Sequence, residues 1–358
     1  MGPALKRVGV ALTSLTLAIY ATACESGTGP SANFDAQATA NSVQEVVAAF
    51  QANQDALASM NLATQALGAS MAGQMLPKNP GQILPSPEAA QSMVKDLTVT
   101  AIFPSNALGV TFVYDTAQGM YVPSDQTGAP ANGVRVIYYA VDPMTKTPVE
   151  PLNALGYIDL TDESTPASVR LGITIVRTGD TDVTLADYYI DAAYTQTQTD
   201  LGVQLASVGY VSNGTDELDF DLSETLTLSS TSGMQVTMDY QASLAGKDVS
   251  VRFQGTGTVD QQTGDPSTLH VTFTLHNGAD EVVLDVTITG DSALDGTLAF
   301  NGNTVVSLSG TTDSPSFTKA DGSALTQSDM EALQNIWNSV GDLFNFVGDL
   351  FGPASTTG

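Results

Sequence analysis

The chain has few of the residues that usually carry chemistry at neutral pH. Its 358 residues include one cysteine, two histidines and one tryptophan, and only 7% are aromatic. A single cysteine excludes a disulfide framework and a zinc site of the usual thiolate type. Basic residues are also scarce, because 11 Lys and Arg stand against 38 Asp and Glu. So acidic a chain is a poor match for nucleic acid or for an anionic lipid surface.

Long apolar runs are lacking as well. The apolar stretch from Val8 to Tyr20 is about 13 residues long, whereas a membrane-spanning helix needs roughly 20. Two basic residues, Lys6 and Arg7, precede this stretch, and the small residues 21–23 follow it. A basic start, a short apolar run and a small-residue cleavage site are typical of a secretory signal peptide. We therefore expect residues 1–23 to be an export signal.

The export signal ends at the only cysteine. The segment Ala21-Thr22-Ala23-Cys24 resembles the lipobox of bacterial lipoproteins, in which cleavage precedes a cysteine that is then acylated. The resemblance covers residues 1–24, departs from the family at Ala21, where Leu is usual, and identifies no family for the rest of the chain. It implies an exported protein, lipid-anchored through Cys24 to a bacterial membrane on its periplasmic or outer-membrane face. The alternative is an ordinary signal peptide cut after Ala23, which leaves a free thiol.

The residues after the cysteine fall into three short regions. Residues 24–40 are small and polar, which is typical of a flexible tether. Residues 41–75 predict an N-terminal helical segment that begins near Ser42, where Ser42 and Glu45 form a capping box. Residues 76–96 are rich in proline, which ends the helix and predicts a connector.

From residue 97 to 312 the apolar residues recur with a period of two, which predicts a large antiparallel β-domain. The dipeptides Asn213-Gly214, Asn277-Gly278 and Asn301-Gly302 fall between such runs and suit type I′ turns. We expect about 12 to 14 strands in a meander, and a sheet so wide curls or partly closes. The predicted fold class is mainly β with flanking α, an N-terminal and a C-terminal amphipathic helix covering the sheet.

The C-terminal helix is predicted for residues 326–351, and Ser328 with Glu331 forms a second capping box. Its apolar stripe contains Leu333, Ile336, Trp337, Val340, Leu343, Phe344, Val347 and Leu350. Gly341 and Gly348 each lower its intrinsic stability by about 1 kcal/mol relative to alanine, so packing must hold this helix. The stripe packs on the sheet of its own chain, docks on a partner or second copy, or lies on a membrane. The acidic polar face disfavours a membrane surface.

Carboxylates are the one abundant reactive group. Glu217, Asp219 and Asp221 alternate with apolar residues, so they lie on one face of a strand at steps of about 6.6 Å. With a cross-strand neighbour these three side chains are weak candidates for a calcium site, since Ca²⁺ takes several oxygen ligands. The alternative is a solvated acidic face that discourages pairing between sheet edges.

Other catalytic constellations are not found in the sequence. His270 and His276 lie on the polar face of one strand, about 20 Å apart, and cannot share a metal ion or a proton relay. No serine lies in a G-x-S-x-G motif and no Walker A motif occurs. Gly255-Thr256-Gly257 lacks a following helix and indicates a bulge or bend in a strand. We assign no catalytic residue, no cofactor and no resident metal.

These features predict a lipid-anchored protein of the bacterial cell envelope with a non-catalytic scaffold or interaction role. Its expected partners are the membrane, through acyl chains on Cys24, and another envelope protein or a lipophilic ligand. The first alternative is a carrier or binder of lipophilic molecules, because a curled sheet under helices resembles the half-barrel of periplasmic lipoprotein carriers. That resemblance is architectural, and a fold does not define a function. The second alternative is a carboxylate-based hydrolase, which needs an acid of raised pKa in a cleft.

Overall fold

The computed structural model describes residues 34–52, 102–142, 147–197, 200–229, 233–259, 266–290 and 292–350. The helices in these residues are α2 (Ala36–Gln51) and α6 (Gln327–Asp349). The first strands are β1 (Val110–Asp115), β2 (Met120–Ser124), β3 (Gly133–Tyr139), β4 (Ala154–Asp162), β5 (Ser168–Arg177), β6 (Val183–Gln196), β7 (Asp200–Ser212) and β8 (Glu217–Ser229). The others are β9 (Gly233–Leu244), β10 (Val249–Val259), β11 (Pro266–Asn277), β12 (Asp280–Thr289), β13 (Ala293–Phe300), β14 (Asn303–Thr311) and β15 (Ser314–Lys319).

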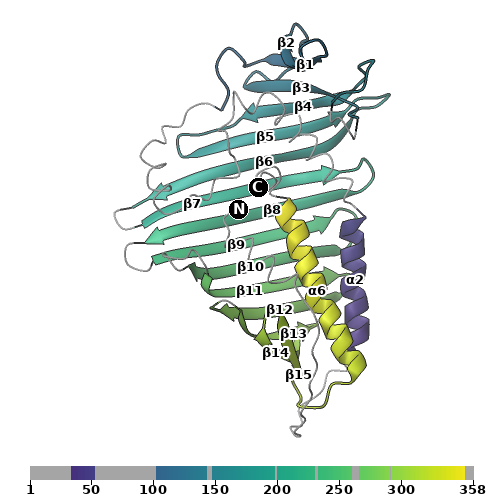
Figure 1. The fold of residues 1–358 in the computed structure, drawn as a ribbon, viewed down its shortest axis with the longest axis vertical. Coiled ribbons are helices and arrows are strands. Elements are labelled where there is room, and N and C mark those ends of the chain that lie inside the picture. Colours follow the sequence, from purple (N-terminus) through teal and green to yellow (C-terminus); the bar gives the residue numbers. More distant parts are fainter. Residues whose placement is uncertain are drawn as a thin grey trace. The chain divides into compact units, whose positions relative to one another are not determined.

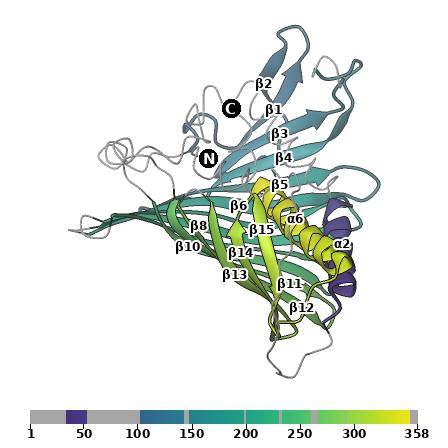
Figure 2. The same cartoon turned by 60° about the horizontal axis from the view of Figure 1, so that its bottom comes forward.

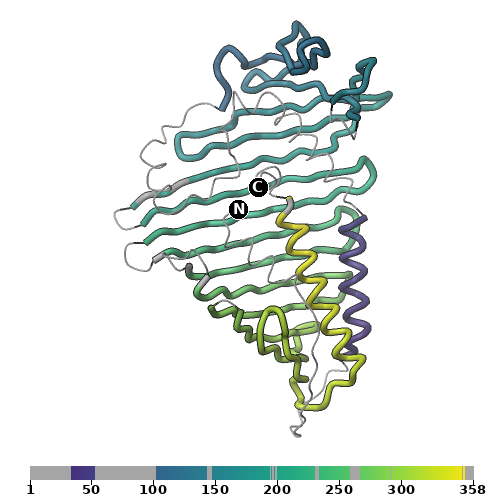
Figure 3. Tube along the Cα trace, in the orientation of Figure 1, coloured from purple at the N-terminus to yellow at the C-terminus, as the bar shows by residue number. Residues whose placement is uncertain are grey.

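Within the described residues all fifteen strands form one open sheet, in the order β15-β14-β13-β12-β11-β10-β9-β8-β7-β6-β5-β4-β3-β1-β2. Successive strands run back and forth along the trace (Figure 3), as in a meander. One pair departs from this pattern, since β1 lies parallel to β3. The edge strands β2 and β15 contain Pro123 and Pro315, and proline at an edge hinders pairing with another sheet. The predicted class, a large antiparallel sheet with an N-terminal and a C-terminal helix, is confirmed.

The chain divides into two compact units. The first, called the helix-covered unit, comprises the described residues within Met1–Ala52, Gln196–Gly202 and Leu222–Asp349. The second, called the strand unit, comprises those within Asn53–Thr195, Val203–Asp221 and Leu350–Gly358. The helix-covered unit therefore holds α2, α6 and strands β9 to β15, whereas the strand unit holds strands β1 to β5 and nearly all of β6.

The helix-covered unit has its core between one face of the sheet and the two helices. Rows of apolar side chains run across the strands, because register places inward-facing residues opposite one another. One row contains Tyr240, Phe253, Phe273, Leu284, Leu298 and Val306, all buried. Helices α2 and α6 lie side by side over this face (Figures 1 and 2), and Phe50 of α2 contacts Phe346 of α6 edge-on at 5.5 Å. The two helices thus cover the apolar face of the sheet, which one sheet alone would leave exposed.

The strand unit is built on the same alternation. Val136, Ile158 and Ile175 are opposite one another on β3, β4 and β5, and all three are buried. The residues next to them in sequence, among them Arg135 and Asp159, are only partly buried. The period of two therefore separates an apolar face from a polar face in both units.

Helix α2 begins earlier than the sequence predicted. Asp35 is its N-cap, and the Asp35 carboxylate accepts a hydrogen bond from the amide of Ala38 at 3.0 Å. Ser42 and Glu45 lie inside the helix, so the predicted capping box is wrong; instead, the side-chain amide of Asn277 donates to both, at 3.0 and 3.4 Å. The predicted tether 24–40 overlaps the first helical turn. The predicted helix beyond residue 52 and the connector 76–96 lie outside the described residues.

Helix α6 matches its predicted position but not its predicted cap. Thr326 and Asp329 form the capping box: the Asp329 amide donates to the Thr326 hydroxyl at 3.1 Å, and the Thr326 amide donates to the Asp329 carboxylate at 3.0 Å. Nζ of Lys319, on β15, lies 3.1 Å from Oδ2 of the same carboxylate. Ser328 is therefore within the first turn rather than at the cap. Among the three predicted interpretations of the apolar stripe, packing on the sheet of the same chain is what the structure shows.

Several strand details differ from the expectation. The described strands extend to Lys319, beyond the predicted limit at 312, and number fifteen rather than 12 to 14. Only one of the three Asn-Gly dipeptides places both residues at positive φ, Asn301 at 49° and Gly302 at 77°, as a type I′ turn requires. Strand β10 keeps its register through Gly255 and Gly257 with both neighbours, so the predicted bulge there is wrong. The register shift lies further on, between Thr258 and Val259.

Candidate functional site

The candidate site lies in the helix-covered unit, between α6 and the apolar face of the sheet. Trp337, Val340 and Phe344 are spaced three and four residues apart, which places them on one face of α6. Together with side chains of β9 to β12, among them Met238 and Val271, they enclose a cavity of about 30 Å³. The lining is apolar, so this cavity favours a hydrocarbon group over water.

An aromatic cluster fixes α6 beside the cavity. The ring of Phe344 lies 5.1 Å from that of Phe253 at an interplanar angle of 78°, and 6.2 Å from that of Tyr240. Phe253 in turn lies 4.7 Å from Phe273 on the next strand. Edge-on and tilted aromatic pairs each stabilise by roughly 0.5–1.5 kcal/mol beyond their buried area. The helix is thus held by specific ring contacts, although its two glycines weaken it.

Gly255 lies next to the cavity. It lies in register between Met238 of β9 and Val271 of β11, both of which line the cavity. A Cβ atom at position 255 would lie 2.7 Å from Cγ of Met238. The long side chain of Met238 therefore bends over the glycine and fills the space that a larger residue would occupy.

Glu224 is a carboxylic acid buried on the apolar face, with 6% of its surface exposed. The hydroxyl of Tyr240 donates to its Oε2 atom at 3.2 Å, while Oε1 has no hydrogen-bond partner among the described residues. Burial raises the pKa of the Glu224 carboxyl, and the hydrogen bond from Tyr240 offsets part of that rise. The same burial raises the pKa of Tyr240 well above its usual value. The pair is therefore neutral more readily than an exposed glutamate and tyrosine would be.

Trp337 carries a second buried polar atom with no partner in the described part of the chain, its indole Nε1. The residue is 2% exposed, lines the cavity, and is the only tryptophan of the protein. Leaving a buried donor unpaired costs about 1–3 kcal/mol.

The predicted calcium candidates lie along a strand rather than around a point. Glu217 and Asp219 are half-buried and Asp221 is exposed, alternating with buried Leu218 and Phe220. Burial, and then the nearby Asp219, raises the pKa of Glu217. Across the described ranges, no group of three or more His, Asp or Glu side chains is placed to hold a metal ion. The acidic strand carries no metal site that the geometry supports.

The two histidines form separate cross-strand pairs on the polar face. Nε2 of His270 lies 2.9 Å from Oδ1 of Asp285, and Nε2 of His276 lies 3.6 Å from Oε2 of Glu281. Both imidazoles are nearly half exposed, at 46% and 45%. Exposed contacts of this kind contribute little, roughly 0–1 kcal/mol even between full charges. The structure does not bring the histidines together.

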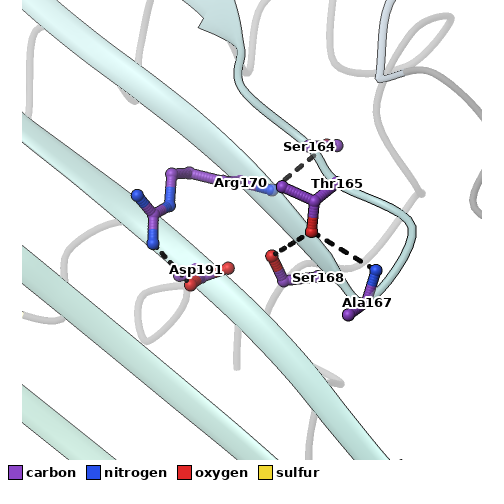
Figure 4. Close-up of polar contacts among 6 residues, drawn as sticks. All are labelled: Ser164, Thr165, Ala167, Ser168, Arg170 and Asp191. Carbon is purple, nitrogen blue, oxygen red and sulfur yellow. Dashed lines mark hydrogen bonds and ion pairs between the residues drawn. The ribbon is translucent and has the colours of Figure 1, made fainter.

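In the strand unit, arginines hold aspartates across neighbouring strands. Arg170 contacts Asp191 at 3.0 Å beside the turn that joins β4 to β5, where the Arg170 amide donates to the Ser164 hydroxyl (Figure 4). The guanidinium of Arg135 donates two hydrogen bonds, of 2.7 and 2.6 Å, to the carboxylate of Asp159. Such bidentate pairs fix strand register, because the planar guanidinium matches the carboxylate.

Sequence reasoning missed Glu224, although a signal was available. The apolar series Leu218, Phe220, Leu222 continues in steps of two to position 224, where an acid replaces the expected apolar residue. An acid in phase with a buried series indicates a buried carboxyl. The cavity gave no comparable signal, since it depends on how α6 lies across strands distant in sequence.

Cys24 lies outside the described residues. None of the described helices is both long enough and apolar enough to cross a membrane. Comparison of the chain with protein-family models, with curated proteins and with solved structures found no match.

Proposed function

We propose that the protein is exported and lipid-anchored to a bacterial membrane through Cys24, and that its β-domain has a non-catalytic scaffold or interaction role. The observation that carries this proposal is the position of Cys24. It follows directly on a signal-like segment, and α2, the first helix of the described residues, begins at Ala36, twelve residues later. A short polar segment of that length separates an acylated residue from a folded domain.

The use of charge in the domain supports a non-catalytic role. The ion pairs Arg135–Asp159, Arg170–Asp191 and Arg252–Asp239 all connect adjacent strands. Charged side chains arranged in this way stabilise strand pairing. Among the described acids Glu224 is the one that is buried, and its partner is a tyrosine rather than the second carboxylate that a glycosidase-type mechanism needs.

The anchor is tested by growing cells that express the wild type or Cys24→Ser with a radiolabelled fatty acid. We expect label on the wild-type chain, which fractionates with membranes, and no label on Cys24→Ser. Ser26→Ala is the matched control, because it changes a neighbouring residue and keeps the thiol. Equal labelling of wild type and Cys24→Ser would contradict the proposal.

A second candidate function, binding of a lipophilic molecule, is favoured by the apolar cavity beneath α6. Four aromatic residues contribute to its lining: Phe253, Phe273, Trp337 and Phe344. The test is mass spectrometry of the protein after gentle extraction from cells. A lipid that co-purifies in stoichiometric amount supports this function, and a protein free of lipid argues against it.

A further inference from the structure

We propose that the turn between β13 and β14 is a site of spontaneous covalent modification, at which Asn301 loses ammonia, forms a succinimide ring with Gly302, and is converted to aspartate or isoaspartate. The reactants are the side-chain amide of Asn301, the backbone nitrogen of Gly302 and one water molecule. No enzyme or cofactor takes part. The inference is independent of the anchoring and binding roles proposed above, because it concerns the chemistry of one turn.

The reaction exchanges one carbon–nitrogen bond for another. The nitrogen of Gly302 gives up its proton and attacks Cγ of Asn301, which closes a five-membered ring. The bond between Cγ and Nδ2 breaks, and Nδ2 takes up a proton and leaves as ammonia. Water then opens the ring at one of its two carbonyl carbons. Opening at Cγ gives aspartate, and opening at the backbone carbonyl carbon gives isoaspartate.

The attacking nitrogen is free to react. Asn301 and Gly302 form a two-residue hairpin loop with φ of 49° and 77°, and within the described residues the N–H of Gly302 donates no hydrogen bond. The side-chain amide of Asn303 donates to the backbone carbonyl of Asn301 at 3.1 Å. This carbonyl belongs to the same peptide group as the Gly302 nitrogen. The hydrogen bond polarises that group and makes its N–H easier to deprotonate.

The carbon that is attacked is polarised by the neighbouring strand. Oδ1 of Asn301 accepts a hydrogen bond of 2.8 Å from the backbone amide of Glu281, on β12. Negative charge develops on Oδ1 during the attack, and a fixed backbone donor stabilises it as in an oxyanion hole. Glu281 is held in place, because its carbonyl accepts a hydrogen bond of 2.9 Å from the amide of Asn301.

The leaving nitrogen lies beside a carboxylate. Nδ2 of Asn301 donates to Oδ1 of Asp280 at 3.1 Å. After the attack this nitrogen takes up a proton and becomes a cationic amine. A carboxylate stabilises that cation more strongly than it stabilises the neutral amide of the starting side chain. The nucleophile, the oxyanion and the leaving group are thus each favoured by a different neighbour.

The other two Asn-Gly dipeptides are protected at the attacking nitrogen. The glycine of Asn277-Gly278 donates its N–H to the carbonyl of Asp248 at 2.7 Å, and the glycine of Asn213-Gly214 donates to the hydroxyl of Ser212 at 2.9 Å. Loss of the proton there breaks a hydrogen bond and leaves two lone pairs facing each other. The net value of one such bond predicts that Asn301 reacts roughly threefold to tenfold faster than either site.

The three dipeptides are compared within one molecule. The folded full-length chain is incubated at pH 8 in water enriched in the heavy isotope of oxygen, and proteolytic fragments are analysed by mass spectrometry over time. Ring opening adds one labelled oxygen, which separates this reaction from any that occurs during digestion. We expect the fastest conversion at Asn301, with isoaspartate among its products. Equal or slower conversion at Asn301, or aspartate without isoaspartate, would overturn the proposal.

A parallel incubation in concentrated urea tests whether the fold is the cause. The unfolded chain has lost the hydrogen bonds that distinguish the three sites, so we expect similar rates at all of them. An advantage of Asn301 that persists in urea would overturn the proposal, because the local sequence would then explain it.

Two variants test the neighbours of the reacting atoms. Asp280→Asn keeps an acceptor for Nδ2 but removes its charge, and we expect conversion of Asn301 to slow by roughly threefold or more. Asn303→Ala removes the donor to the backbone carbonyl and should also slow it. Asp295→Asn is the matched control, since it makes the same change at an exposed position on β13, before the turn. Circular dichroism verifies that the variants fold, and equal rates in all three would overturn the proposal.

Discussion

Among single residues, Glu224 is the one whose ionisation is coupled most directly to the packing of the domain. Its carboxyl is buried, and burial raises its pKa above the ordinary value of 4.5. The folded state therefore binds the Glu224 proton more tightly than the unfolded chain does. The contribution of this group to stability is complete below the unfolded pKa and is lost as pH rises through the folded pKa.

Replacing Glu224 with glutamine should remove this loss, because the amide stays neutral at every pH. We expect Glu224→Gln to be more stable than the wild type at pH 8, by about 1–3 kcal/mol, and the difference to shrink toward pH 4. Urea unfolding at several pH values measures it. Glu331→Gln, at an exposed position on α6, is the control and should leave the pH dependence unchanged. Parallel stability curves for Glu224→Gln and the wild type would show that the carboxyl does not titrate in its buried setting.

The prediction of single residues from the sequence succeeded where one face of a strand decides the outcome. His270 and His276 were placed on the polar face and are found there, each with its own acid. The predicted alternation of Glu217, Asp219 and Asp221 with buried apolar residues is also found. The sequence could not show that Trp337 and Met238 line one cavity, because this depends on how α6 crosses strands far away in the chain.

Among the elements, strands β10 and β13 show how two glycines of one sheet differ in what surrounds them. Gly255 and Gly296 both lie in the row of Met238, Val271 and Val286. A Cβ atom at 255 would meet the flexible side chain of Met238, whereas one at 296 would meet the backbone oxygen of Asp285. A side chain can move, but a backbone atom in a sheet ladder cannot move without breaking hydrogen bonds.

We therefore expect Gly255→Ala to change the free energy of unfolding by less than about 1 kcal/mol, since Met238 shifts. Gly296→Ala should destabilise by about 1–3 kcal/mol through overpacking. Chemical unfolding of the two variants side by side makes the comparison, because both substitutions add the same methyl group on the same face. A larger loss for Gly255→Ala would mean that the side chain of Met238 cannot move.

Helix ends were the least predictable elements, and the reason is visible at both helices. The Ser/Thr-x-x-Asp/Glu pattern occurs at Thr326 and again at Ser328, two residues apart, and only the first lies at the helix start. At α2, Asp35 caps the helix without a partner acid three residues later. The capping pattern in the sequence therefore allows several first residues for a helix. Packing against the sheet decides which of them begins it.

For the whole molecule, the period-two pattern was sufficient for the fold class but not for the limits of the sheet. Strand β15 lies beyond the predicted end at 312, where short polar residues hide the alternation. The parallel placement of β1 beside β3 also has no local signal, because it follows from long-range pairing. Short edge strands bury little, so their sequences are weakly constrained.

Net charge is the property of the whole chain that most affects its stability in different solvents. The formal charge is −27, and repulsion among surplus acids opposes the compact state. The ion pairs such as Arg252–Asp239 act in the opposite sense, but they are short-range. Screening shortens the Debye length from about 30 Å at 0.01 M salt to about 8 Å at 0.15 M, which weakens long-range repulsion far more than contacts at 3 Å.

We therefore expect the thermal midpoint to rise by a few degrees, on the order of 2–5 °C, between 0.01 and 0.15 M NaCl at pH 8. A variant with four exposed acids neutralised, Asp125→Asn, Asp221→Asn, Asp295→Asn and Asp342→Asn, should melt higher at low salt and respond less to added salt. These positions lie on four different segments, so a shared effect reports net charge rather than one contact. A midpoint that falls as salt is added would contradict this prediction. It would mean that the cross-strand ion pairs stabilise the fold by more than the summed repulsion among the acids destabilises it.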